Sequence, residues 1–592
     1  MILQALNDYY RRKCDDADPA QRLPVFGLEQ KEIPFVLEIT RDGTLVQLTD
    51  TRTPNGKKKV AQTFRVPLGV KRAAGVVSNL LWDTPEYALG VDGRGNPERV
   101  AQQHAHFLGR IKALPQAAQE DAGIQAILAF LANLNLAQLQ AQPAWAQALE
   151  SNSLMSFRLH GDVDLVCQRP DVVQAVLNIA SDPDDPIVMC LVTGADAPVQ
   201  RLHASIKGVW GAQSVGANIV SFNLPAFESY GKTKRQGENA PVSQAAAFAY
   251  TTALNHLLRK DSSQRIQVGD ASTVFWSEKE SDFETAIPDI FGEPPKDDPD
   301  QCTRAVHALF AAMQTGKLGG EEEGNRFHVL GLAPNAARIS IRFYHCLPLR
   351  ELGQRIVQYF DDLEIARGPK DPQYPSLFRL LAAVAVQGKA DNIPPNLGGA
   401  IVDAVFAGSD VPYPSLWLNA AVGRCRAEQN VTYLRAAAIK ACLNRQIRRS
   451  SVTSPSQSPE KEFLPMLDLS NPSPAYRMGR LFAALEKIQE EASPGLNATI
   501  RDRYYGAASS TPVAVFTALL RLKNSHLKKL PDKRGMWFEK LISEILATVA
   551  DFPKHLPLPD QGRFALGYYH QRQDFFTKKA DPSTPAAEGT PA

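Results

Sequence analysis

The residues best suited to binding chemistry lie between Lys207 and Lys260. This stretch is punctuated by glycines and precedes an alanine-rich helix that we predict to begin near Ser243. Glycine lets a backbone approach another molecule closely, and amide and cationic side chains reach the groove edges and phosphates of nucleic acids. The pattern therefore favours a nucleic-acid contact over an active site. The side chains concerned are Lys207, Gln213, Asn218, Asn223, Lys232, Lys234, Arg235, Gln236 and Asn239.

A second candidate is the run from Thr51 to Arg72, which contains basic residues but no Asp or Glu. Its PNGKKK sequence is typical of a tight turn between strands and would present lysines at a hairpin tip. A solvated loop is the alternative, but charge kept only for solubility is usually mixed in sign. We therefore expect DNA contact from this run. Its basic residues are Arg52, Lys57, Lys58, Lys59, Arg65, Lys71 and Arg72.

A third basic cluster spans Arg424 to Arg449 and contains one acid, Glu428. It predicts a phosphate track. The alternative for its last members is that cations at a helix C-terminus complement the helix dipole, and the two uses are compatible. These last members are Arg445, Arg448 and Arg449.

Two more groups of cations occur near the C-terminus. Lys528 and Lys529 lie in a basic cluster over 523–534, and Arg501 and Arg503 stand beside two tyrosines at 504–505. Basic groups interleaved with aromatic ones are typical of single-strand binding. For the tyrosines, packing in the core is the commoner use.

Catalytic motifs are missing from the sequence. There is no GxxxxGK[ST] phosphate loop, no GxSxG elbow and no HExxH. His104 and His106 form a close pair, but the carboxylates of a two-metal nuclease do not follow them. We therefore expect a non-catalytic reader or scaffold that needs neither metal nor cofactor.

Composition limits the setting in which such a protein would work. The 592 residues carry a net charge of only +2, so any nucleic-acid surface must come from local segregation of charge. Seven scattered cysteines without CxxC spacing favour a reducing compartment over a disulfide framework or a zinc site. No run reaches the roughly 18 apolar residues of a membrane span. We expect a cytoplasmic protein without a membrane partner.

Hydrophobic patterning predicts an α+β fold, with a mixed α/β body over residues 1–370 followed by all-α regions. The later regions are an inner helical part at 371–449, a Ser/Pro-rich linker at 450–475, a helical bundle at 476–577 and a disordered tail at 578–592. Strands are expected at 34–40, 62–68, 186–192, 273–276 and 339–345. Three apolar stripes with helical spacing, at 478–488, 516–527 and 537–549, predict the bundle.

Four blocks of sequence carry a resemblance to a known family. They are MILQALNDYYRR at the start, VKRAAGVVSNLLWDTPEYALGVD from Val70, SFNLPAFESYGK with QGENAPVSQAAAFAYTTALNHLL, and YRMGRLFAALEKIQEEA with NATIRDRYYGAASSTP from Tyr476. Together they resemble the large subunit of the type I-C CRISPR surveillance complex, Cascade. The blocks extend from one end of the chain to the other.

This resemblance implies an antiviral function. Similar proteins recognise the protospacer-adjacent motif (PAM) in double-stranded DNA, while base pairing with a CRISPR RNA (crRNA) reads the rest of the target. They also promote duplex opening and R-loop formation, hold the displaced strand, and recruit a separate helicase-nuclease. The implied partners are therefore crRNA, target duplex, displaced strand, the backbone and crRNA-processing subunits, the small subunit and the helicase-nuclease.

We place the PAM reader by chemistry within the blocks that carry the resemblance. The reader candidates are Lys57, Lys58, Lys59, Lys71, Arg72, Asn79, Lys207, Gln213, Asn223, Lys232 and Asn239, and the candidates for a strand-separating wedge are Gln236, Phe227 and Tyr230. The resemblance also implies that the C-terminal region is made separately as the small subunit, and we place its start near Met478, with Met466 or a non-Met codon as the alternatives. Two alternatives stay open: a scaffold that binds crRNA and partner subunits without reading DNA, and a metal-dependent nuclease with an unrecognised site.

Overall fold

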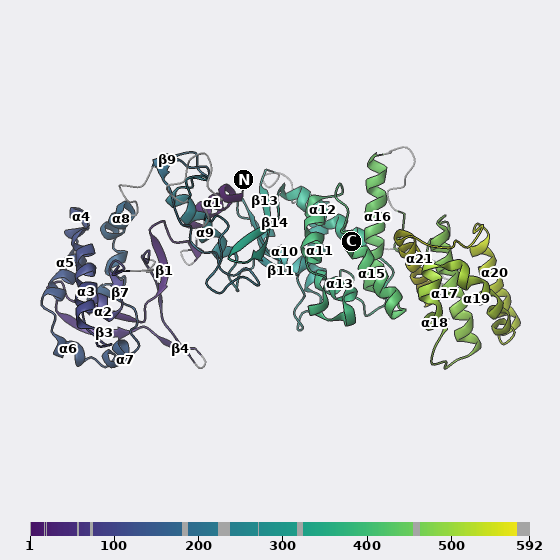
Figure 1. Ribbon diagram of the computed structural model, residues 1–592, viewed down its shortest axis with the longest axis horizontal. Helices are drawn as coiled ribbons and strands as arrows, with labels where there is room; N and C mark the ends of the chain where they lie inside the picture. The colour runs from purple at the N-terminus through teal and green to yellow at the C-terminus, as the bar shows by residue number, and fades with distance from the viewer. Residues whose placement is uncertain are drawn as a thin grey trace, which may run out of the picture. The chain divides into compact units, whose positions relative to one another are not determined.

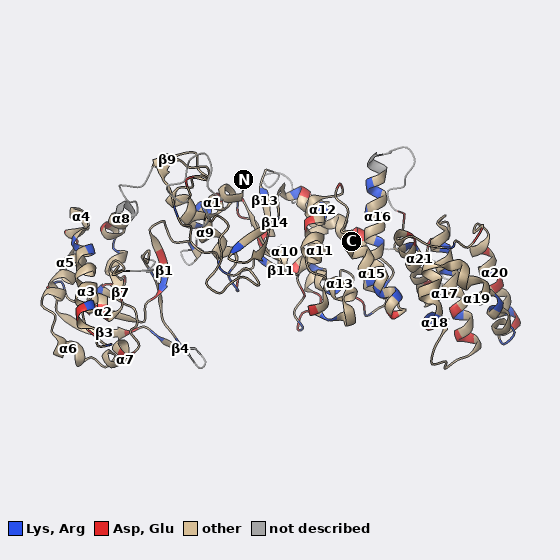
Figure 2. Ribbon diagram, in the orientation of Figure 1, with Lys and Arg blue, Asp and Glu red and all other residues tan. Residues whose placement is uncertain are grey.

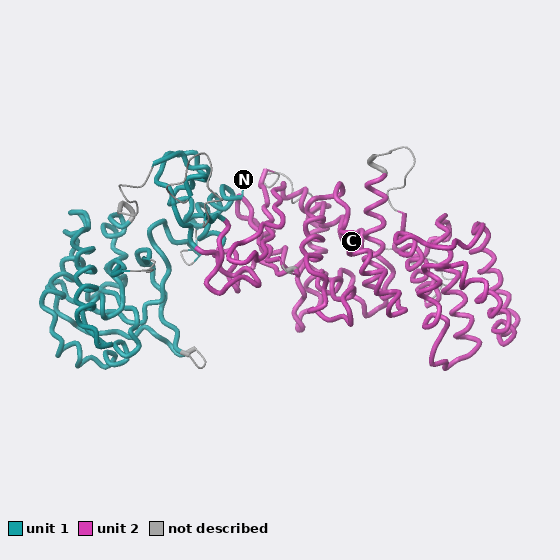
Figure 3. Tube along the Cα trace, viewed as in Figure 1, with its two compact units in different colours: residues 1–204, 220–254 teal, residues 205–219, 255–592 magenta. Residues whose placement is uncertain are grey.

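The computed structural model describes residues 2–16, 18, 21–55, 58–70, 75–179, 187–222, 237–269, 271–315, 324–453 and 462–576. The chain divides into two compact units (Figure 3): residues 1–204 with 220–254, and residues 205–219 with 255–592. Both units contain a sheet, whereas only helices follow Pro348 in the described part of the second unit, so the fold is α+β as predicted. Among the described residues, no helix is both long and apolar enough to cross a membrane.

The first unit is built on a four-stranded sheet in the order β3-β2-β8-β7. Its outer strands β3 and β7 are labelled in Figure 1. Strand β2 pairs antiparallel with β3 and parallel with β8. A parallel pair needs a long crossover, which the helices between these strands supply. Almost every residue of β2 and β8 is buried, because helices cover the sheet.

Three two-stranded ribbons complete the strands of the first unit: β1 with β6, β4 with β5, and β9 with β10. The strands are β1 (Leu28–Glu32), β2 (Phe35–Ile39), β3 (Leu45–Asp50), β4 (Thr53–Asn55), β5 (Lys58–Val60), β6 (Thr63–Pro67), β7 (Trp82–Asp83), β8 (Met155–Leu159), β9 (Ile187–Met189) and β10 (Asp196–Pro198). The helices are α1 (Ile2–Cys14), α2 (Pro85–Ala88), α3 (Pro97–Lys112), α4 (Gln116–Gln119), α5 (Ala122–Ala132), α6 (Leu136–Gln140), α7 (Trp145–Glu150), α8 (Pro170–Ile179) and α9 (Gln244–Leu257), the last of which continues into the second unit.

The second unit begins with an antiparallel sheet in the order β11-β12-β13-β14. Every residue of β12 is buried. The strands are β11 (Arg265–Val268), β12 (Ala271–Ser277), β13 (Arg326–Asn335) and β14 (Arg338–Pro348). The helices are α10 (Phe283–Phe291), α11 (Gln301–Gln314), α12 (Leu349–Leu363), α13 (Leu377–Val384), α14 (Leu397–Ala407), α15 (Ser415–Glu428), α16 (Tyr433–Thr453), α17 (Pro474–Ala492), α18 (Ile500–Ser510), α19 (Pro512–Leu527), α20 (Asp532–Leu546) and α21 (Leu558–Phe576).

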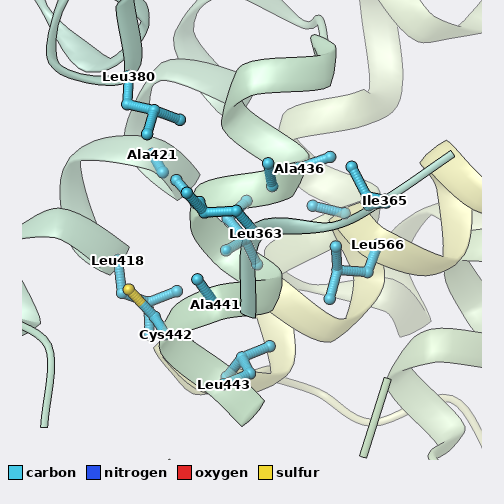
Figure 4. Close-up of a cluster of buried hydrophobic side chains, with 14 of the residues drawn as sticks. Leu363, Ile365, Leu380, Leu418, Ala421, Ala436, Ala441, Cys442, Leu443 and Leu566 are labelled. Atoms are coloured by element: carbon cyan, nitrogen blue, oxygen red, sulfur yellow. The ribbon is translucent and has the colours of Figure 1, made fainter. Parts of the chain in front are cut away.

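One continuous hydrophobic core runs through the second unit, from the sheet to the last helix. Figure 4 shows part of it, where Leu363 of α12 and Leu443 of α16 lie near Leu566 of α21. Helices α17 and α21 approach until their backbones touch, because a Cβ atom at Gly567 would overlap the carbonyl oxygen of Tyr476. Glycine is therefore required at this crossing.

The expected strands and helices agree with the structure over most of the described chain. The runs at 34–40, 62–68, 273–276 and 339–345 form β2, β6, β12 and β14, and the helix expected near Ser243 begins at Gln244. Only Ile187–Met189 of the run at 186–192 is a described strand. The last apolar stripe also ends earlier than expected, because α20 stops at Leu546 rather than at 549.

Two helices, α18 and α21, join the three that the stripes predicted in the C-terminal bundle. Nearly the whole circumference of α21 is buried, so it shows no one-sided stripe. Residues 454–461 of the expected linker and the expected tail at 578–592 lie outside the described residues. Phe463, just after the gap, is buried against Tyr476 with ring centroids 5.6 Å apart.

Candidate nucleic-acid interface

The acid-free run at 51–72 begins with a hairpin, as its PNGKKK sequence predicted. Thr53 pairs with Val60 and Asn55 with Lys58, so the connection consists of Gly56 and Lys57. Lys59 is exposed to solvent on β5, where a phosphate can reach it. Lys57 and the side chain of Lys58 lie outside the described residues.

Two arginines of the same run, Arg52 and Arg65, differ in whether the guanidinium group is available to bind a phosphate. The Arg52 guanidinium donates two hydrogen bonds of 2.7 Å to Asp50 and stacks 4.5 Å from the centroid of Phe35. This pairing lowers the pKa of the Asp50 carboxyl. Arg52 is therefore neutralised by the acid that stands just before the run. Arg65 instead lies on the exposed face of β6, between the buried residues Phe64 and Val66.

The loop at 70–79 is closed at its base by Asn79. The Asn79 side-chain oxygen accepts a hydrogen bond of 3.0 Å from the Val70 N–H. The backbone N–H of Asn79 donates to the Asp83 carboxylate at 2.8 Å. Asn79 is buried, so the structure corrects its expected place at a DNA surface and makes it the anchor of the loop. Lys71 and Arg72, which this loop carries, lie outside the described residues.

Helix α3 fixes the chain on the far side of that loop. The Ser78 N–H donates to His106 Nδ1 at 3.2 Å, and Arg110 donates to the Ser78 carbonyl at 2.6 Å. His104 pairs with the Tyr87 carbonyl at 2.9 Å. Both histidine side chains therefore form hydrogen bonds with nearby backbone, His106 with that of Ser78 and His104 with that of Tyr87. Over the described parts of the chain, no group of three or more His, Cys, Asp or Glu residues is arranged to bind a metal.

The second unit contributes a glycine-rich loop at 205–219. Ile206 pairs with Ala217 across its base, and the Lys207 N–H donates to Asn255 Oδ1 at 2.7 Å. Gly208 has φ +88°, and a Cβ atom there would lie 2.6 Å from the Leu258 carbonyl oxygen. Glycine is thus needed where the loop crosses the end of α9. The loop leaves Lys207 and Gln213 exposed.

Trp210, at the tip of this loop, is a candidate that the sequence reasoning missed. Its side chain is 64% exposed, whereas its backbone N–H is fixed by a 2.9 Å hydrogen bond to Ser272 Oγ. An exposed aromatic ring on a fixed backbone is suited to stacking on a base. The signal in the sequence was a tryptophan between glycines in GVWGAQ.

Residues 223–236 lie outside the described residues, and they include Asn223, Phe227, Tyr230, Lys232, Lys234, Arg235 and Gln236. Asn218 and Asn239, on either side, are both half-buried. The Asn218 backbone pairs with the start of β14, where its carbonyl accepts from the Ile339 N–H at 3.0 Å.

The expected phosphate track is corrected for two arginines of α16, Arg445 and Arg448. Arg445 is 1% exposed and donates to the carbonyls of Ala404 at 2.6 Å and Val411 at 3.0 Å. Arg448 is also buried, and it forms an ion pair of 2.5 Å with the fully buried Asp362. These two arginines belong to the buried core because the fold places carbonyl and carboxylate oxygens beside them, which accept their hydrogen bonds. Arg449 remains exposed.

In the C-terminal bundle, Arg503, Lys528 and Lys529 are exposed. Arg501 lies within 3.8 Å of both Glu486 and Asp502, so its charge is largely balanced. Tyr505 is buried, which agrees with core packing as the commoner use of tyrosine. Figure 2 shows acidic residues among the basic ones on these helices, so the bundle offers separate cations rather than a continuous basic track.

A comparison with protein families identifies the chain. The model of the CRISPR-associated protein family Cas_Csd1 matches residues 6–576. A comparison with curated proteins finds no match.

Proposed function

Because the chain belongs to the Csd1 family of CRISPR-associated proteins, we propose that it is the non-catalytic large subunit of a crRNA-guided type I-C Cascade. In this proposal it recognises the PAM in duplex DNA, promotes duplex opening and R-loop formation, and recruits a separate helicase-nuclease. The crRNA reads the remaining target by base pairing, so the protein needs to read only a short flanking motif.

The observation that carries the proposal is the exposed, lysine-bearing β4–β5 hairpin on a rigid base. Lys59 is exposed on β5, while Trp82 fixes β6, the next strand along the chain, by donating to the Pro67 carbonyl at 2.8 Å. The Gly69 N–H, just after β6, donates to Glu29 of β1 at 2.8 Å. A cation on a rigid ribbon loses little conformational freedom when it binds a phosphate, which favours affinity.

The loop at 205–219 supports the same function. Lys207 and Gln213 supply a cation and an amide, the two side-chain types that reach phosphates and base edges. Trp210 adds a ring that would cover a base exposed when strands separate. We assign phosphate positioning to the hairpin lysines, and base contacts to the glycine-rich stretch that includes Asn223.

A competition gel shift tests this assignment with the assembled, crRNA-loaded complex. The variants are Lys58→Ala with Lys59→Ala, and Asn223→Ala, with Lys112→Ala on the exposed end of α3 as the matched control. Each neutralised phosphate contributes about −0.9 to the log–log salt slope. We expect the lysine variant to lose affinity for all duplexes and to flatten that slope, and Asn223→Ala to lose discrimination between PAM variants.

Other outcomes separate the alternatives. Binding that is unchanged in both variants would overturn the reader assignment. A parent complex whose binding shows no salt dependence would favour a scaffold that does not read DNA. Metal-dependent cleavage of DNA by the purified chain would replace the non-catalytic function with a nuclease.

A second proposed role is that the C-terminal bundle also exists as a separate small subunit. The structure bears on its first residue: Ser473 caps α17 by accepting from the Tyr476 N–H at 3.4 Å, and the buried Tyr476 hydroxyl pairs with His570 at 2.9 Å. A product that starts at Met478 lacks both residues, whereas one that starts at Met466 keeps them. We therefore favour Met466 over Met478. Mass spectrometry of protein from the untagged gene tests this, and a product beginning at Met478, or none, would contradict it.

A further inference from the structure

The β9–β10 ribbon belongs to the first unit, and its strand β9 is labelled in Figure 1. It exposes a group of large apolar side chains. Ile187 is 68% exposed and Met189 59%, and their i, i+2 spacing places them on the same side of β9. Val188 and Leu191 are exposed as well. Single apolar residues on a surface are ordinary, but a contiguous group marks an interaction site.

The base of this ribbon is firmly held. The Ser243 N–H donates to the buried Cys190 sulfur at 3.2 Å, and the Leu191 N–H donates to the Pro241 carbonyl at 2.9 Å. The Gln200 N–H donates to the Val242 carbonyl at 2.8 Å. Isolated two-stranded ribbons are only marginally stable in water, so these contacts keep an otherwise unsupported apolar element in place.

Charge around the ribbon argues against nucleic acid as its ligand. Asp196 is exposed on β10 opposite Met189. This carboxylate would repel phosphates. It complements a surface that carries lysine or arginine around an apolar centre.

The composition of β10 also disfavours pairing with a second copy of the chain. A charged residue and a proline on an edge strand are features that prevent edge-to-edge association, and β10 has both in Asp196 and Pro198. The apolar side chains lie on β9 instead. A side-chain contact with a different protein therefore fits the ribbon better than a shared sheet.

We propose that the β9–β10 ribbon is a docking element that inserts Ile187 and Met189 into an apolar groove, rimmed by basic residues, on a neighbouring protein subunit of the assembled complex. The inference rests on the proposed function in that it needs the chain to work within a multi-protein assembly.

The test uses the full chain and a purified complex of crRNA with the other subunits, from which this chain has been left out. The variant is Ile187→Ser with Met189→Ser, and the matched control is Val163→Ser, an 86% exposed position in the same unit. Because both variants change exposed positions, both should keep the parent's unfolding temperature. We expect the double variant to bind the complex about tenfold more weakly, and the control to bind like the parent. Asp196→Lys, which reverses the rim charge, should weaken binding as well.

Hydrogen exchange supplies a second readout on the same samples. Amides at 187–199 should become protected when the parent joins the complex without DNA. Unchanged binding of the double variant, protection that appears only when DNA is added, or a self-association of the free chain that the double variant abolishes would each overturn the proposal. A parent chain that fails to join the complex would instead contradict the proposed function.

Discussion

Two basic segments, helix α16 and the β4–β5 hairpin, look alike in the sequence but differ in burial in the structure. On α16, Arg445 and Arg448 are buried, and Lys440 also reaches inward to donate to the Asp362 carbonyl at 3.1 Å. On the β4–β5 hairpin, Lys59 is exposed. Both segments are nearly free of acids in the sequence, so a local excess of cations does not by itself identify a nucleic-acid surface.

The difference comes from the residues that the tertiary structure brings to each segment. Asp362 of α12 is far from α16 in sequence, yet it lies 2.5 Å from Arg448 and 4.0 Å from Arg445. Backbone carbonyls near the end of α14 take the remaining donors of Arg445. For Lys59, which is solvent-exposed, no such acceptor is needed. The first segment therefore contributes to stability, and the second is available for binding.

The largest effect is expected from removing the acid beneath α16. Asp362→Asn leaves Arg445 and Arg448 buried without a counter-charge, which typically costs about 3–5 kcal/mol of unfolding free energy. Glu544→Gln is the control, because that exposed acid lies 4.0 Å from Lys540 and should contribute less than about 0.5 kcal/mol. Denaturant unfolding measures both. Equal, small losses would show that the α16 cations do not depend on Asp362.

The second-largest effect is a pH dependence of the folding stability, which comes from the buried His570. Burial, together with the positive charge of Lys440, lowers the pKa of His570 to about 3. In the unfolded chain this histidine binds a proton below about pH 6.5, whereas in the folded chain it stays neutral. Stability is therefore complete above pH 6.5 and falls as the pH drops toward 3, by up to about 1.4 kcal/mol per pH unit.

Comparing the parent with His570→Asn by denaturant unfolding at pH 7 and pH 5 tests this dependence. The substitution should lower stability at pH 7 and reduce the loss between the two pH values. His555→Asn, a substitution at an exposed histidine, serves as the control. An identical pH dependence in all three proteins would contradict the neutral state of His570.

A smaller effect is expected at the base of the loop at 70–79. Asn79→Ala leaves the Val70 N–H without its acceptor, which should lower the unfolding free energy by about 1–2 kcal/mol. Because Asn79 anchors the loop that carries Lys71 and Arg72, DNA affinity should fall while discrimination between PAM variants is retained. A loss of discrimination with unchanged stability would instead show that Asn79 contacts a base.

The smallest change in stability is expected at the hairpin. Lys59→Ala removes an exposed side chain and should alter the unfolding free energy by less than about 0.5 kcal/mol, even though it weakens DNA binding. Denaturant unfolding and a salt titration of DNA binding, performed on the same preparation, measure both quantities. A destabilisation comparable to that of Asp362→Asn would remove the contrast between the two segments.

Local patterns predicted much of the fold and less of the candidate site. The alternating run at 62–68 and the PNGKKK turn are sequence-local signals, and both appear as expected in β6 and the β4–β5 hairpin. The buried places of Asn79 and Arg445 were not predictable, because their partners come from other segments. Helix α21 was missed since it is buried on nearly all sides and has no polar face to give a periodic signal.

The sequence by itself determined the α+β class, most of the strands, the family to which the chain belongs and the segments that are rich in cations and glycine. Each of these depends on residues close together in the chain, or on long blocks of sequence. Tertiary structure alone decided which cations are exposed, because exposure depends on partners such as Asp362 that fold next to a distant segment. It also decided that β9 carries an uncovered apolar face, since burial is a property of the packed chain and not of Ile187 or Met189 themselves.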